Sequence, residues 1–232
     1  MGSLLAILAG KHMSSRGRSG TVAVDATSNA WSIFKHMADP LYLSLWFPGF
    51  AKEDILARTA SVLRQFPFSA ARPGVTYVVI QPVGWEEATV LEQRFAPGIA
   101  PEEAMEKVAD LLHDDYAYVF EAWWDLWAPN DNGDWTLLPH KVTFVAQGKE
   151  FDEAAYTESG HVQIDFGPDW PFLHEEASLT EDVEQRVRAN ITKLVDFTNK
   201  LEQNLNLTGR VLWSESEENL AQKLISRLQQ VH

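Results

Sequence analysis

Cysteine is absent from this 232-residue sequence. That absence excludes disulfide bonds, thiolate metal sites and cysteine nucleophiles. Basic residues are also scarce, with 19 Lys and Arg against 33 Asp and Glu, for a formal net charge of −14. Proteins that bind nucleic acids or anionic membranes usually neutralise phosphates with Lys and Arg. The composition therefore argues against both partners and favours a protein partner or a small neutral or basic ligand.

Long apolar runs are missing near the N-terminus. Residues 4–9 form a short apolar stretch that cannot span a bilayer, and no basic residue precedes it as in a signal peptide. We expect residues 1–20 to be a flexible leader and residues 21–232 to form a single α+β domain, with a possible subdivision near residue 130. The expected location is the cytoplasm.

Known catalytic and cofactor motifs are missing as well. The sequence has no phosphate-binding glycine loop, dinucleotide fingerprint, nucleophile elbow, zinc-protease helix or EF-hand loop. Residues 113–115 and 174–176, and the pair His161 and Asp165, contain imidazole and carboxylate ligand types. His161 and Asp165 are too far apart on one strand to share an ion. We therefore expect neither a metal site nor a cofactor.

Apolar periodicity and Pro or Gly punctuation predict the elements of the first half. Strands are predicted at 41–47, 75–83, 88–95 and 116–127, and helices at 52–66 and 101–112. Residues 41–127 thus run in β-α-β-β-α-β order, which resembles the ferredoxin-like split βαβ arrangement. The resemblance implies two helices over one face of an antiparallel sheet, and it implies no particular activity.

The second half is predicted to extend the same sheet. Further strands are expected at 135–148, 161–167 and 210–214, with an acidic loop at 150–160. A capping box of Ser178 and Glu181 predicts a long helix to about residue 206. A last helix is marked by Leu220, Leu224 and Leu228, and residues 21–25 form a weak edge-strand pattern. The predicted fold is α+β, an antiparallel sheet of about seven to eight strands with helices mainly on one face.

Alternation within three consecutive strands predicts one apolar and one polar face of the sheet. If the strands pair in sequence order, the polar face collects the side chains of Glu121, Trp123, Asp125, Lys141, Gln147, His161 and Asp165. One interpretation is a solvated sheet face. The other is a site for acid–base chemistry or for binding a polar ligand. Trp123 fits the solvated interpretation least well, because exposed tryptophans tend to mark contact sites.

Two further patterns have alternative interpretations. Trp123, Trp127 and Trp135 surround one predicted hairpin, where they could pack in the core or bind a carbohydrate. The 181–206 helix has a near-heptad apolar stripe. That stripe could cover the sheet within the chain or form the seam of a homodimer.

Three functional hypotheses follow from these patterns. We favour a non-enzymatic binding or interaction protein, because no catalytic signature is present. The first alternative is a cofactor-independent hydrolase or isomerase. In it Glu121 or Asp165 is the base, His161 the acid–base partner and Lys141 stabilises negative charge, while Asp125 is a weaker candidate beside Glu121. The second alternative is a carbohydrate-binding module that uses the three tryptophans.

Overall fold

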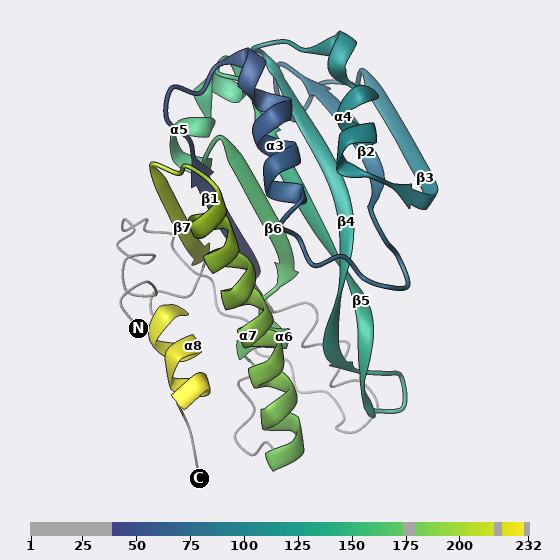
Figure 1. Ribbon diagram of the computed structural model, residues 1–232, viewed down its shortest axis with the longest axis vertical. Coiled ribbons are helices and arrows are strands. Elements are labelled where there is room, and N and C mark those ends of the chain that lie inside the picture. Colours follow the sequence, from purple (N-terminus) through teal and green to yellow (C-terminus); the bar gives the residue numbers. More distant parts are fainter. Residues whose placement is uncertain (1–38, 174–179, 216–219, 230–232) are drawn as a thin grey trace, which may run out of the picture.

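A seven-stranded antiparallel sheet with helices packed on it forms the described part of the chain (Figure 1). This computed structural model describes residues 39–173, 180–215 and 220–229. The strands are β1 (Pro40–Trp46), β2 (Val75–Pro82), β3 (Leu91–Ile99), β4 (Tyr116–Pro129), β5 (Trp135–Gln147), β6 (Val162–Pro168) and β7 (Gly209–Ser214). The helices are α3 (Ile55–Leu63), α4 (Pro101–Glu106), α5 (Tyr156–Ser159), α6 (Trp170–Leu173), α7 (Glu181–Asn204) and α8 (Leu220–Gln229), with 3-10 turns η1 (Lys52–Asp54), η2 (Ala109–Leu111) and η3 (Phe151–Ala154). The predicted leader at 1–20, the predicted strand at 21–25, Ser178 and the 174–176 cluster lie outside the described residues.

The strand order is β3-β2-β4-β5-β6-β1-β7, and every neighbouring pair is antiparallel. This confirms the predicted α+β class and the antiparallel sheet. The chain order β1-α3-β2-β3-α4-β4 also matches the pattern predicted for residues 41–127. The ferredoxin-like arrangement is not confirmed, however, because β1 pairs with β6 and β7 rather than with the strands around α4. Strands β5 and β6 lie between β4 and β1.

Helices α3, α4 and α7 pack on the same face of the sheet (Figure 1). Sheet side chains that point toward them form one apolar cluster with the helices. Trp124 is fully buried in this cluster, in ring contact with Phe66, Phe166 and Phe172. Burial of such large rings supplies most of the apolar area that stabilises a fold of this kind.

Helix α7 is present as predicted, but the predicted capping box of Ser178 and Glu181 is wrong, because Glu181 is the first helical residue. Its N-cap is Thr180, whose side chain accepts a hydrogen bond from the backbone N–H of Val183. The predicted apolar stripe is buried within the chain at Val187, Ile191, Leu194, Thr198 and Leu201. The stripe therefore covers the sheet, and a homodimer through α7 would have to use another side of the helix. Within the described ranges, no helix is long and apolar enough to cross a bilayer.

A second, smaller apolar cluster lies on the opposite face of the sheet. Ala117 and Val145 are buried there beneath Phe151, with Val119 at the edge. The acidic segment 150–160, predicted as a loop, contains η3 and α5. It is anchored by Phe151, the one large apolar side chain at its start. This segment covers part of the face that the sequence predicts to be polar, and so limits the area that remains accessible.

The turn after β2 contains a strained residue. Val83 has φ 58°, although it is 56% exposed and β-branched. A left-handed backbone costs a residue with a Cβ about 1–2 kcal/mol, whereas glycine adopts it freely. We expect Val83→Gly to raise the free energy of unfolding by about 0.5–1 kcal/mol, since part of the relief is offset by glycine's larger chain entropy. Urea denaturation followed by tryptophan fluorescence measures the change.

Val90→Gly is the matched control for this substitution. Val90 is also exposed and follows the same turn, but its φ is not positive. Glycine there should destabilise slightly, through chain entropy alone. Equal changes in the two variants would show that Val83 is not strained.

Candidate functional site

The face of the sheet opposite the helices has a continuous row of aligned side chains, one from each strand. We call it the cross-strand row. Direct register partners connect its members from one edge of the sheet to the other. In sheet order they are Arg94, Tyr77, Glu121, Thr143, Asp165, Tyr42 and Trp213. Side chains opposite each other on adjacent strands are close enough to interact, so the row forms one surface.

Glu121 and Lys141 meet near the centre of this row. The Lys141 Nζ donates a hydrogen bond to the Glu121 Oε1 over 2.8 Å. Lys141 is a direct register partner of Trp123, one position along from the row. The pair neutralises one negative and one positive charge of the surface, and it holds the Glu121 carboxylate in place.

Asp165 lies beside this pair, between Thr143 of β5 and Tyr42 of β1. Its carboxylate accepts a hydrogen bond from the backbone N–H of Gly167 at 2.7 Å. Burial raises the pKa of Asp165, while the Gly167 hydrogen bond and the charge of Lys141 act in the opposite direction. Among the described residues no Lys or Arg forms a salt bridge with it. Asp165 is thus a half-buried carboxylate without a cation in contact.

Aromatic side chains lie on both sides of Glu121 and Asp165 in the row. Tyr42 stacks on Trp213 with ring centroids 4.5 Å apart, and the Trp213 Nε1 donates to the Ser44 hydroxyl. Burial, followed by the charges of Asp165 and Glu215, raises the pKa of Tyr42, so its phenol remains neutral. At the other end, the Arg94 guanidinium lies over the Tyr77 ring at 4.2 Å. These contacts fix the orientation of the side chains.

His161 occupies a different environment from Asp165. It is 8% exposed, and its ring stacks between Phe50 at 4.2 Å and Tyr156 at 5.3 Å. Its Nδ1 accepts a hydrogen bond from the backbone N–H of Phe47. Burial, with a smaller effect of Lys149, lowers the pKa of His161 to about 4. The imidazole is therefore neutral near pH 7, and roughly 13 Å of strand separates it from Asp165.

The remaining β4 candidates contact residues 69–76, which include the start of β2. The Asp125 carboxylate accepts hydrogen bonds from the Ser69 hydroxyl at 2.6 Å and from the Ala70 backbone at 3.3 Å. The Trp123 Nε1 donates to the Thr76 hydroxyl, and Arg72 lies over the Trp123 ring at 4.1 Å. Both side chains are therefore engaged within the chain.

Trp127 and Trp135 lie at the far end of the β4–β5 hairpin, where their backbones pair with Leu137 and Pro129. The Arg186 guanidinium of α7 lies 5.0 Å from the Trp127 ring. Trp135 is half-buried and packs against the main apolar cluster. The predicted tryptophan platform is thus spread over three different environments.

Helix α7 replaces a strand along part of β4. The β2 partner of β4 ends at Ala122, and beyond it the β4 backbone bonds to other groups. Ser69 N–H donates to the Trp123 carbonyl, and the Lys193 Nζ donates to the Asp125 carbonyl. Asn190 accepts from the Trp127 N–H and donates to the Trp127 carbonyl, as a neighbouring strand would.

Tyr42, Trp213, Tyr77 and Arg94 are members of the row that were not among the sequence candidates. Alternation within residues 41–47 could place Tyr42 on a polar face, but no local pattern indicates that β1 lies beside β6. In the described part of the chain, no group of three or more His, Asp or Glu side chains could hold a metal ion.

Comparison with known proteins adds no relatives. No protein-family model, curated protein or solved structure matches the chain.

Proposed function

We propose that this chain is a non-enzymatic binding protein whose cross-strand row receives a basic segment of a protein partner. One observation carries the proposal. Asp165 is a half-buried carboxylate without a cation in contact, and it lies between the Glu121–Lys141 pair and the Tyr42–Trp213 stack. A Lys or Arg from a partner could pair with Asp165 while its aliphatic stem packs on Tyr42.

Charge complementarity supports a basic partner. Lys141 forms its salt bridge with Glu121, and Arg94 lies 3.8 Å from Glu92, so among the described residues Asp165 is the carboxylate of the row without a salt-bridge partner. The whole chain has a formal net charge of −14, which accelerates encounter with a positively charged partner. The row also spans all seven strands, and a surface of this extent suits a protein segment better than a small molecule.

The surroundings of the other candidates support binding over catalysis. Contacts within the chain already engage both β4 carboxylates, since Glu121 is paired with Lys141 and Asp125 with Ser69. His161 is buried away from Asp165, with Nδ1 already accepting a hydrogen bond. A carbohydrate platform needs uncovered rings, but a guanidinium lies over each of Trp123 and Trp127.

Charge reversal in the row tests the proposal. Asp165→Lys should weaken capture of the partner at least about tenfold, because it places an ammonium where the partner's cation would bind. The matched control is Asp131→Lys, the same change at an exposed position of the β4–β5 turn. Affinity capture from the source cell extract with the wild type and both variants, quantified by mass spectrometry, compares them. Tyr42→Ala is a second variant, in case Asp165→Lys fails to fold by circular dichroism.

A protein retained by the wild type and by Asp131→Lys, but lost with both row variants, supports the proposal. Capture that is unchanged by the row variants contradicts it. So does turnover of ester or glycoside substrates that Asp165→Asn abolishes, since that result would favour the hydrolase alternative.

A further inference from the structure

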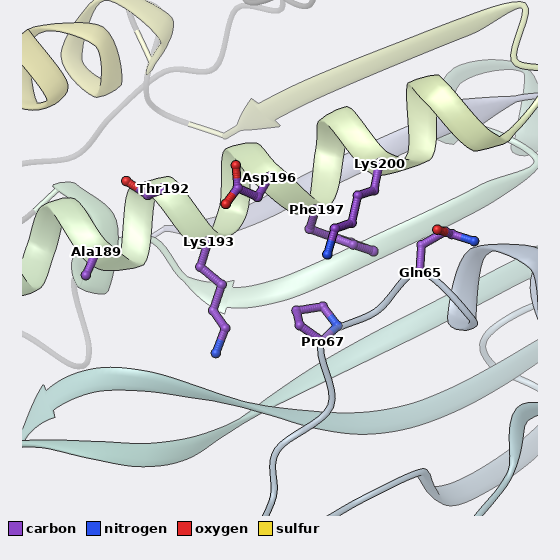
Figure 2. Close-up of a pocket in the computed structure, with 8 residues that line it drawn as sticks. All are labelled: Gln65, Pro67, Ala189, Thr192, Lys193, Asp196, Phe197 and Lys200. Carbon is purple, nitrogen blue, oxygen red and sulfur yellow. The ribbon is translucent and has the colours of Figure 1, made fainter.

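A cavity lies on the helix-covered side of the sheet, whereas the cross-strand row lies on the opposite face. The cavity is formed between α7 and the residues that follow α3, and its volume is ≈ 300 Å³ (Figure 2). The lining residues are Gln65, Pro67, Ala189, Thr192, Lys193, Asp196, Phe197 and Lys200. This volume is at the lower end of the range found for small-molecule sites.

Lys193 supplies a half-buried ammonium to this cavity. Its Nζ donates one hydrogen bond, of 2.7 Å, to the Asp125 backbone carbonyl. An ammonium has three N–H donors, so a single carbonyl leaves donor capacity for a ligand. Burial lowers the pKa of Lys193, and the nearby Asp125 carboxylate partly opposes that effect. An anion in contact with Nζ would offset the unfavourable burial of this charge.

The other walls combine a second cation with apolar surface. Lys200 lies two helical turns after Lys193, and Figure 2 shows both side chains extending from α7 toward the Pro67 side of the cavity. Pro67 provides the accessible apolar wall, and Phe197, which is only 1% exposed, closes the cavity from the core side. Asp196 is exposed and points away from the lysines in the same view. Two lysines therefore extend to one side of the cavity, while the aspartate of its lining points to the other.

We infer that this cavity binds a small organic carboxylate, with the anionic group held by Lys193 and Lys200 and a short apolar body against Pro67 and the small exposed part of Phe197. The inference is independent of partner binding at the cross-strand row, because the two surfaces share no side chain. The alternative is that Lys193 serves only to bond the exposed backbone edge of β4. In that case the cavity has no ligand preference.

Binding of a carboxylate should be coupled to the protonation of Lys193. An anion stabilises the charged ammonium, so it should raise the pKa of Lys193 and lose affinity as the amine deprotonates at alkaline pH. The titratable groups that face Lys193 are Asp125 of β4 and, on α7, Asp196 and Lys200.

Hexanoate, which joins a carboxylate to a short alkyl chain, is the probe, and hexanol is its neutral counterpart. Calorimetry with the full chain should show saturable binding of hexanoate with a Kd of about 1 mM or below, and at least about tenfold weaker binding of hexanol. Amide shifts in NMR spectra should concentrate at Gln65, Ala189 and Phe197. Spectra of ¹³C-lysine-labelled protein should show the rise in the pKa of Lys193.

Three variants locate the site. Lys193→Met should weaken hexanoate binding at least about tenfold, since it removes the buried ammonium but keeps the stem. Ala189→Phe fills the cavity from its exposed rim without changing a lysine, so it keeps the inference testable if Lys193→Met is unstable. Lys107→Met, at an exposed lysine that neither lines the cavity nor belongs to the cross-strand row, is the control and should bind as the wild type does.

Absence of saturable hexanoate binding up to about 10 mM overturns the inference. Equal affinity of the wild type and Lys193→Met, or equal binding of hexanoate and hexanol, also overturns it. Failure of partner capture at the cross-strand row would not change the binding of hexanoate or hexanol. The two proposals can therefore fail independently of each other.

Discussion

Asn190→Ala is expected to lower the free energy of unfolding by about 3 kcal/mol. The Asn190 side chain is 2% exposed and makes three hydrogen bonds. Its amide N–H groups donate to the carbonyls of Trp127 at 2.9 Å and Pro171 at 3.0 Å, and its Oδ1 accepts from the Trp127 N–H at 2.8 Å. Alanine would leave these backbone groups without partners. Each unsatisfied buried group costs about 1–3 kcal/mol, reduced where water can enter. Guanidinium denaturation followed by fluorescence measures the loss.

Thr192→Ala is the control, because Asn190 and Thr192 belong to the same Asn-Ile-Thr sequon. Thr192 is exposed and only bonds the Arg188 carbonyl within its own helix. Its replacement should change the free energy of unfolding by less than about 1 kcal/mol. A role of Asn190 as a glycan acceptor would give both variants the same phenotype, whereas its bonds to β4 and Pro171 predict a large difference.

Acidification is expected to destabilise the fold through His161. The folded-state pKa of His161 is about 4, against 6.5 for an unperturbed imidazole. Between these values the unfolded chain binds a proton and the folded chain does not, so the free energy of unfolding falls as the pH falls. The slope is about 1.4 kcal/mol per pH unit, and the total approaches about 3 kcal/mol near pH 4. Above pH 6.5 the imidazole is neutral in both states, and this contribution to the pH dependence disappears.

Denaturation curves at about pH 7 and about pH 4.5, for the wild type and for His161→Phe, measure this effect. Phenylalanine keeps the stack with Phe50 and Tyr156 but does not titrate. The variant should lose the Phe47 hydrogen bond at every pH, yet show a smaller decrease in stability on acidification. Asp165 acts in the opposite sense just above its ordinary pKa, because its raised pKa makes the folded state bind the extra proton. Both proteins contain Asp165, so its effect cancels, and parallel pH profiles would contradict the prediction.

Local periodicity in the sequence predicts the strands well but not their partners. The two-residue alternation in residues 116–127 and 141–147 correctly separates the buried Trp124 and Phe144 from Glu121 and Lys141. Pairing of consecutive strands then places Glu121, Thr143 and Asp165 side by side. The position of β1 depends instead on contacts with β6 and β7, more than a hundred residues away, and no local pattern encodes them. For this reason the sequence does not identify Tyr42 as a member of the row. For the same reason the predicted β-α-β-β-α-β order does not lead to ferredoxin-like strand pairing.

The surroundings of a side chain are equally hard to infer from alternation. His161 follows the same strand periodicity as Asp165, but Phe50 and Tyr156 come from other segments and bury its ring. Asn190 is part of a sequon and lies on a helix, so its sequence context suggests a surface residue. It is buried because α7 crosses β4 at the point where β2 has ended. The burial of His161 and of Asn190 depends on segments that are distant in the sequence, so only the tertiary structure reveals it.

The substitution of a helix for a strand beside β4 also bears on the solubility of this protein. Backbone groups of residues 123–127 are satisfied by Ser69, Lys193 and Asn190, and two of these three belong to α7. If α7 detaches while the sheet persists, these N–H and C=O groups become a template to which a strand of another molecule can add. Intermolecular association should then begin at this edge, at a rate set by helix detachment and well before the sheet itself unfolds. We therefore expect helix α7 to protect the chain against aggregation as well as to cover its core.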